Sequence, residues 1–336
     1  MKEIVIGEND AGQRLDRFLK KYLANAPLSA VYKAVRKDVK VDGVRCKEDF
    51  QLQAGQTLQL YISDAQLSEW TRRKQTAKAK RQFGLVFEDE NIIIVSKPFG
   101  LLVHGDKTEK KDTLANQVTD YLIETGAYSP RTEKSFVPGP ANRLDRNTTG
   151  IVVFGKNAAA QRELARMFRE DGGVFKSYYT IACGALKEEQ HLKGRLLKDE
   201  ARNVCKVLPL EDERGRYIET IVRPVCCSKG AFGKGKNSRG YTLCDVELIT
   251  GRSHQIRAHL ASIGHPLAGD TKYGGRSFSF AESFLPGSTT QALHAYKITF
   301  TAPQGCLGYL RGQAFTAPLP AGWDGLTEEI FGKVSI

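Results

Sequence analysis

The sequence has little of what marks an exported or membrane-bound protein. Its longest apolar runs, such as Ile92–Val95 and Ile151–Phe154, are about four residues long, whereas a membrane-spanning helix needs about 20. The first residues, MKEIVIGEND, carry acids and lack the basic flank and apolar stretch of a signal peptide. We therefore expect a cytoplasmic protein that does not interact with a membrane.

Cysteine and histidine are too scattered to suggest a disulfide framework or a metal site. The seven cysteines show no C-x-x-C spacing, and we interpret the adjacent Cys226 and Cys227 as small strand residues rather than a redox-active pair. His254, His259 and His265 are five and six residues apart, whereas a helix aligns ligands at three or four. We expect a reducing compartment and no bound metal.

Glycine-rich phosphate loops are missing as well. Neither G-x-G-x-x-G nor G-x-x-x-x-G-K-[ST] occurs, so the sequence does not support a nucleotide cofactor, and we expect no cofactor of any kind. What the chain has instead is positive charge, because 50 Lys+Arg against 38 Asp+Glu give a formal net charge of +12. Such an excess favours nucleic acid as the partner.

Residues 1–65 are expected to form a small unit of two helices and a hairpin. Apolar residues recur at helical spacing from Leu15 onward, and Ser29 is placed to cap a second helix. Asp42-Gly43 is typical of a hairpin turn between short strands. Asp16 lies inside the first helix and away from its apolar stripe, so we expect it to be a solvated surface acid.

Positive charge gathers at two places near the N-terminus. We interpret the group around the second helix as a phosphate-contacting surface rather than only a solvated helix face; it consists of Lys33, Arg36, Lys37 and Lys40. Residues 66–82 include the run WTRRKQTAKAKRQ. This segment is expected to be a basic linker or an RNA-facing arm, and charge alone does not choose between them.

Residues 83–336 are expected to form a second and larger unit. Short apolar strands at 91–96 and 151–154 and longer strands at 174–183 and 241–250 alternate irregularly with helices. A helix over 253–263 is followed by glycine and proline, as a helix end often is. This irregular order predicts an α+β fold rather than a doubly wound parallel sheet.

The string RLDR occurs twice, and its second copy has the setting of a reactive carboxylate. Asp145 lies between two turn-forming runs and directly before a buried strand, a position at which folds often display functional groups. Its neighbours Arg143 and Arg146 favour the ionised carboxylate, which can act as a nucleophile. The residues alone leave a structural Arg–Asp cluster equally open.

Four segments, in order, resemble motifs of the RluA-type pseudouridine synthases. ANRLDRNTTG resembles the family's HRLDxxTSG, with Asn142 in place of the usual His and Thr149 in place of the usual Ser. KPFGLLVH precedes it, and FKSYYTIACG and GRSHQIRAHLASIGHPLAGDTKYG follow it. More weakly, R-L-D-x-F-L and V-x-V-D-G near the N-terminus resemble an S4 domain, a small RNA-binding unit.

The resemblance implies that the enzyme converts uridine in RNA to pseudouridine. It implies a mixed, largely antiparallel sheet with helices and loops around a central cleft, preceded by a small S4 domain. Asp145 would be the nucleophile, attacking either the sugar or the base. No redox change or net hydrolysis is involved, which agrees with the expectation of no cofactor.

The same resemblance gives roles to further residues. Arg257 would pair with the nucleophile, and Tyr178 would stack on the uracil. Lys176, two positions away on the same strand, would lie on the same face as Tyr178. Arg143 would occupy the space that the extruded base leaves behind. Leu293 would line the uracil pocket, although a core position is as consistent with the sequence.

Three functions remain in competition at this point. The first is modification of large-subunit (23S) rRNA, because relatives with an S4 domain commonly act there, and the second is modification of tRNA. The third is a noncatalytic RNA-binding or ribosome-assembly factor, which the intact Asp145, Tyr178 and Arg257 argue against. We expect a monomer. The glycine-rich basic stretch 229–239 is either a phosphate contact or a hairpin tip.

Overall fold

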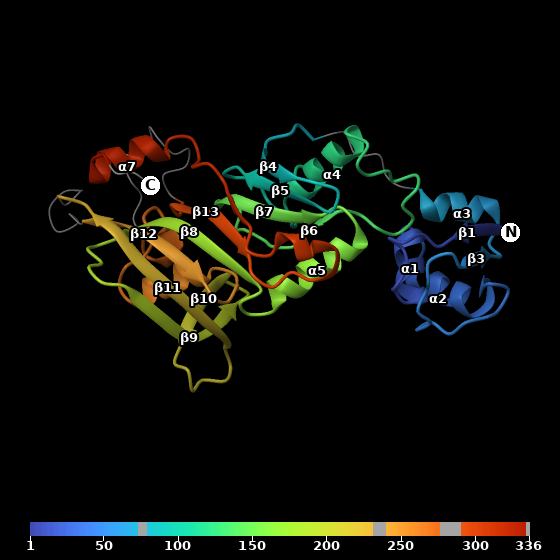
Figure 1. The fold of residues 1–336 in the computed structure, drawn as a ribbon. Coiled ribbons are helices and arrows are strands. Elements are labelled where there is room, and N and C mark those ends of the chain that lie inside the picture. The colour runs from blue at the N-terminus through green and yellow to red at the C-terminus, as the bar shows by residue number, and fades with distance from the viewer. Residues whose placement is uncertain (73–78, 231–239, 276–289, 334–336) are drawn as a thin grey trace.

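The computed structural model describes residues 1–72, 79–230, 240–275 and 290–333. Residues 73–78 of the basic run in the expected linker, and residues 231–239 of the stretch 229–239, therefore lie outside the described residues. None of the helices in the described ranges combines the length and the apolar character that crossing a membrane requires. Figure 1 shows a small N-terminal unit beside a larger body built on one extended sheet.

The N-terminal unit packs helices against a three-stranded antiparallel sheet of order β1-β3-β2. Phe18 and Leu19 of the first helix and Leu58 and Leu60 of the last strand are fully buried in its core. Its elements are β1 (Lys2–Val5), α1 (Leu15–Tyr22), α2 (Leu28–Lys37), β2 (Val39–Val41), β3 (Thr57–Leu60) and α3 (Asp64–Thr71).

Two expectations for this unit are wrong. The helix α2 begins directly after Pro27, so Ser29 lies within the helix and does not cap it. Asp16 is not a solvated acid, because it is only 4% exposed and pairs with Arg14 at 3.0 Å. Its backbone N–H donates to the carbonyl of Glu48, so a loop distant in sequence covers the helix face that the sequence suggested was open to water.

The larger unit contains an 11-stranded sheet in the described part of the chain, with the path β10-β9-β11-β12-β8-β13-β7-β5-β4. Among the described strands only β7 and β13 pair in parallel, which confirms the mixed, largely antiparallel α+β fold. The elements are β4 (Gly84–Glu88), β5 (Ile92–Lys97), α4 (Leu114–Glu124), β6 (Gly139–Pro140), β7 (Thr149–Gly155), α5 (Ala158–Arg169), β8 (Val174–Cys183), β9 (Gln190–Asp199), β10 (Val204–Leu208), β11 (Arg216–Cys227), β12 (Tyr241–Leu248), α6 (Gln255–Ser262), a 3-10 turn (Thr271–Tyr273), β13 (Leu293–Phe300), a second 3-10 turn (Gly305–Leu310), β14 (Ala314–Thr316) and α7 (Trp323–Phe331).

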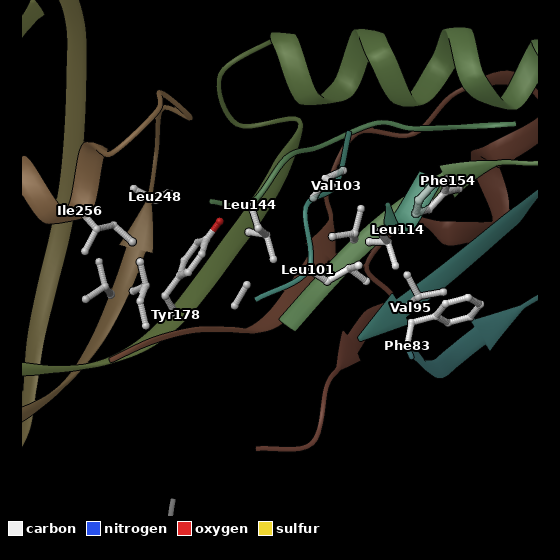
Figure 2. Close-up of a cluster of buried hydrophobic side chains, with 14 of the residues drawn as sticks. Phe83, Val95, Leu101, Val103, Leu114, Leu144, Phe154, Tyr178, Leu248 and Ile256 are labelled. Carbon is white, nitrogen blue, oxygen red and sulfur yellow. The ribbon is translucent and has the colours of Figure 1, made fainter. Parts of the chain in front are cut away.

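The central strand β7 is buried on both faces. Val152 and Phe154 point into one hydrophobic cluster, which α4 and α6 cover, while Ile151 and Val153 point into another, covered by α5. Side chains alternate across a strand, so its continuous apolar sequence supplies both clusters at once. Figure 2 shows the first cluster, with Phe154 near one end and Ile256 at the other.

Polar side chains of the first loop join the N-terminal unit to the larger one. Asp10, only 2% exposed, accepts hydrogen bonds from the backbone N–H and the hydroxyl of Ser135 at 2.8 and 2.5 Å. Asn9 accepts from the N–H of Ala158, at the start of α5, and donates to Glu133, both at 2.9 Å. These contacts tie the N-terminal unit to segments on both sides of the Asp145 loop.

The contact between β7 and β13 requires glycine at position 150. Gly150 has a φ of +111°, and a Cβ placed there would lie 2.1 Å from the carbonyl oxygen of Ala295. We predict that Gly150→Ala lowers the free energy of unfolding by at least about 2 kcal/mol, because it adds both backbone strain and a clash with backbone atoms. Chemical denaturation measures this difference.

Gly84 on the edge strand β4 provides the matched control. A Cβ there has its nearest neighbour at 3.8 Å, and the backbone is not left-handed. Gly84→Ala should therefore change the stability by less than about 1 kcal/mol. Equal effects of the two substitutions would contradict this account of the β7–β13 contact.

Candidate active site

Asp145 lies on the loop that leads into β7, and its neighbours fasten that loop to the strand. The Asn142 side chain donates to the carbonyl of Ile151 at 3.1 Å and accepts from the N–H of Val153 at 2.9 Å. Leu144 is buried in the core beside Tyr178 (Figure 2). The loop is therefore anchored on both sides of Asp145, whose own side chain remains 26% exposed.

A buried lysine, Lys97, also holds this loop in place. Lys97, at the end of β5, donates to the carbonyls of Leu101 and Arg146 at 2.8 Å and of Pro98 at 3.0 Å. Three acceptors match the three N–H groups of an ammonium. Burial lowers the pKa of Lys97 to about 7, and the charge of Asp145 acts against that shift. Sequence reasoning found this lysine in the KPFG segment but gave it no role.

Arg257 of α6 joins Asp145 to a second carboxylate. Its Nη1 donates to Asp145 Oδ2 at 2.9 Å, and its Nε and Nη2 donate to the two oxygens of Asp270 at 2.6 and 2.9 Å. Burial acts to lower the pKa of Arg257, but the hydrogen bonds and charges of Asp270 and Asp145 outweigh it and raise the pKa. The guanidinium therefore stays charged although it is 7% exposed.

The cation beside Asp145 is thus not one of its sequence neighbours. Arg143 and Arg146 are exposed, and Arg146 donates to the carbonyl of Gly100 at 3.0 Å. Within the described residues neither forms an ion pair with Asp145. Asp270, which completes the pairing of Arg257, was missed by the sequence reasoning. The only signal for it is its place in the GDTKYG segment.

All six residues expected at the site line one open cleft of about 850 Å³, which is within the size range of ligand pockets. The cleft lies between the Asp145 loop, the strand β8 and the start of α6. Its wall carries additional positive charge from four residues: Arg146, Lys198, Arg252 and Lys272. A negatively charged chain would be attracted to this surface.

Tyr178 and Lys176 project from β8 into the cleft. Tyr178 is 8% exposed and packs in the core (Figure 2), and burial, aided by the charge of Asp145, raises the pKa of its hydroxyl. Burial also lowers the pKa of Lys176, with Arg252 acting in the same direction. The tyrosine thus presents a neutral aromatic ring close to a carboxylate.

Leu293 and Arg143 occupy opposite environments. Leu293, at the start of β13, belongs to the hydrophobic core and also lines the cleft. Arg143 is exposed at the rim. Burial lowers the pKa of the nearby His104, and the charge of Arg143 adds to that effect.

The helix α6 begins two residues later than expected. His254 has a φ of +58° and precedes the first helical residue, Gln255. This turn aims the His254 ring at the site, where its Nε2 lies 3.7 Å from Asp145 Oδ2. Spacing arguments had considered His254 only as a metal ligand and missed this position.

Comparisons with known proteins indicate which family the chain belongs to. Residues 91–262 match the family described as RNA pseudouridylate synthase. The chain is 32% identical over 305 residues to the ribosomal large subunit pseudouridine synthase C of Vibrio vulnificus, covering 89% of this chain and 88% of that protein. It is 30% identical over 311 residues to the protein of the same name from Escherichia coli, covering 90% and 89%.

A solved structure supports the fold independently. Human RNA pseudouridylate synthase domain containing 4 superposes with a TM-score of 0.52 at 19% identity, covering 70% of this chain and 88% of that chain. The family match extends over half of the sequence, and the relatives cover most of it. The chain belongs to the RNA pseudouridylate synthase family.

Proposed function

We propose that this enzyme isomerises uridines of large-subunit ribosomal RNA to pseudouridine with Asp145 as the nucleophile. The observation that carries the proposal is an accessible carboxylate, paired with a buried arginine, at the wall of a basic cleft beside a neutral tyrosine. The choice of large-subunit RNA rests on the names of the relatives, which match this chain over nearly its whole length.

The reaction makes and breaks bonds within one nucleoside. The bond from uracil N1 to ribose C1′ breaks, the uracil turns, and a bond from C5 to C1′ forms. The hydrogen on C5 is lost as a proton and N1 gains one, so the product is an isomer. Asp145 would form a temporary bond to the sugar or to the base and leave again as the carboxylate. Both points of attack remain part of the proposal.

The target uridine has to leave its base stack before it reaches Asp145. Extrusion costs a few kcal/mol, and contacts to the flipped base and to the gap it leaves help to offset that cost. The ring of Tyr178 offers a stacking surface for uracil inside the cleft. Arg143, exposed at the rim, has a planar guanidinium that suits the vacated space in the RNA.

The N-terminal unit is proposed to capture RNA as an S4-like domain. Lys33, Arg36 and Lys37 are exposed on α2, and Lys40 lies on the adjacent strand β2. The contacts of Asp10 hold this surface to the body that carries the cleft. A long RNA could therefore bind the basic helix and present a uridine to the cleft at the same time.

We also propose that the enzyme acts as a monomer in the cytoplasm. Asp145, Tyr178, Arg257 and Asp270 all come from one chain, so the site needs no second copy. A noncatalytic role is disfavoured because these side chains are not only present but assembled, with Asp145 and Arg257 in hydrogen-bond contact.

The Asp145→Asn variant should lose isomerisation by at least about 10³-fold, because the amide is a poor nucleophile. Its affinity for RNA should stay within about twofold, because the side chain keeps its size. Pseudouridine formed in a large-subunit rRNA fragment measures the first quantity, and a filter-binding titration measures the second. Turnover at the wild-type rate would disprove the proposed nucleophile.

Asp16→Asn is the control for the second RLDR string. Asp16 is buried and paired in the N-terminal unit, so its replacement should lower the stability of that unit and leave turnover at saturating RNA unchanged.

Mapping pseudouridines in total RNA from a strain that lacks the gene tests the substrate class. Loss of a site in tRNA instead of rRNA would reassign the substrate without changing the chemistry.

Neutralising the basic face of α2 tests RNA capture. The triple variant Lys33→Gln, Arg36→Gln, Lys37→Gln should bind RNA more weakly and with a smaller salt dependence. The slope of log affinity against log salt should fall by roughly 0.7–0.9 for each phosphate that these side chains neutralise in the wild type. Turnover at saturating RNA should stay at the wild-type value.

Three exposed lysines outside α2 supply a charge-matched control. Replacing Lys2, Lys187 and Lys333 by Gln removes the same charge from outside α2, so the salt slope should change much less. If both triple variants shift the slope equally, the effect comes from net charge and the S4-like surface is not the RNA contact.

A further inference from the structure

The two oxygens of the Asp145 carboxylate have different surroundings. Oδ2 accepts the hydrogen bond from Arg257 and faces His254 Nε2 at 3.7 Å. Oδ1 receives no hydrogen bond from the residues that the structure describes. A carboxylate held by one hydrogen bond can still turn about that contact, whereas a second donor at the same oxygen restricts the turn. The position of His254 therefore bears on which oxygen meets the substrate.

The His254 ring is held by Tyr273, which lies in the 3-10 turn after α6. His254 Nδ1 and the Tyr273 hydroxyl oxygen are 2.8 Å apart, and the two rings meet edge to face. The backbone of His254 is in the left-handed region, which residues with a Cβ seldom adopt. The strained backbone and the tyrosine contact together aim the ring at Asp145.

Tyr273 also contacts the other group that approaches Oδ2. The guanidinium carbon of Arg257 lies 5.0 Å from the centre of the Tyr273 ring, within the range of a cation–π contact. The Tyr273 hydroxyl oxygen accepts a hydrogen bond from the N–H of Cys205 on β10 at 2.7 Å. One side chain thus links β10, His254 and Arg257.

These contacts favour one tautomer of His254. The Tyr273 hydroxyl oxygen already accepts from the N–H of Cys205, and His254 Nδ1 lies 2.8 Å from it, so we assign the hydroxyl hydrogen to the bond with His254 Nδ1. Burial raises the pKa of Tyr273 and lowers that of His254, so the phenol stays protonated and the imidazole neutral. A neutral ring that accepts at Nδ1 carries its proton on Nε2, the nitrogen facing Asp145.

We propose that Tyr273 and His254 are positioning residues for Asp145. Tyr273 fixes the orientation and tautomer of His254, and His254 joins Arg257 in holding Oδ2, which leaves Oδ1 directed to the uridine. The distance of 3.7 Å is long for a hydrogen bond, and such contacts commonly shorten when the substrate binds. The inference rests on the proposed role of Asp145 as the nucleophile.

Removing the hydroxyl alone tests the proposal. Tyr273→Phe keeps the ring against Arg257 and loses the hydrogen bonds with His254 and with the N–H of Cys205. Because the first of these orients His254, kcat should fall about tenfold while KM for RNA stays within twofold. His254→Ala should lower kcat by at least as much. His254→Gln should recover part of that loss, because its amide can donate from a position near that of Nε2.

The double variant distinguishes this relay from two separate structural effects. If Tyr273 acts through His254, adding Tyr273→Phe to His254→Ala should lower kcat no further than His254→Ala alone. Multiplied losses in the double variant, or a wild-type kcat in Tyr273→Phe, would overturn the proposal. Thermal unfolding midpoints measured alongside show whether each variant is folded in the assay.

Tyr217→Phe is the matched control. This tyrosine is exposed on β11 and also donates through its hydroxyl, to Glu219 at 2.6 Å, so loss of that hydroxyl should leave kcat unchanged.

The outcome for Asp145→Asn distinguishes a failure of the proposed function from a failure of the proposed positioning role. An active Asp145→Asn variant contradicts the proposed nucleophile, whereas an inactive one together with a fully active Tyr273→Phe contradicts only the positioning role.

Discussion

The contact on which the site depends is the buried guanidinium of Arg257 between two carboxylates. Removing a guanidinium from water is costly, and it is tolerated only where its donors and its charge find partners. Asp270, 1% exposed, occupies two of the donors with both of its oxygens. Asp145 accepts a third hydrogen bond from the guanidinium, through Oδ2. Because Asp270 already balances the cation, the cluster as a whole keeps one negative charge, and that charge sits on the carboxylate that faces the cleft.

The geometry of this cluster is set by strands that are far apart in sequence. Asp145 enters the site on the loop before β7, and Arg257 on the helix after β12, on the far side of β8 and β13 in the sheet. The close approach of β7 and β13 at Gly150 determines where that loop ends. Lys97 holds the same loop in place through its hydrogen bond to the carbonyl of Arg146. Backbone contacts made for packing thus place the reactive side chain.

How much of this could be predicted from the sequence differs between elements. The apolar run at 151–154 and the helical spacing of apolar residues in α1 are visible in the local sequence, and the motif around Asp145 indicates the family. Asp16, Asp270 and His254 were misplaced or overlooked because their environments come from elsewhere in the chain. A loop at Glu48 covers Asp16, and a left-handed turn re-aims His254. Pattern arguments along one element contain no information on such contacts.

The arrangement separates the forces that bring RNA to the enzyme from those that act on the uridine. Exposed charges on α2 and around the cleft act over about a Debye length, roughly 8–10 Å, and weaken as salt rises. The Asp145–Arg257–Asp270 cluster is largely enclosed, so salt screens it much less. The contacts of Asn9 and Asp10 join the two regions, because they connect the unit that carries α2 to the segments on either side of the Asp145 loop. An RNA held by the outer charges therefore meets a cleft whose internal electrostatics are already set.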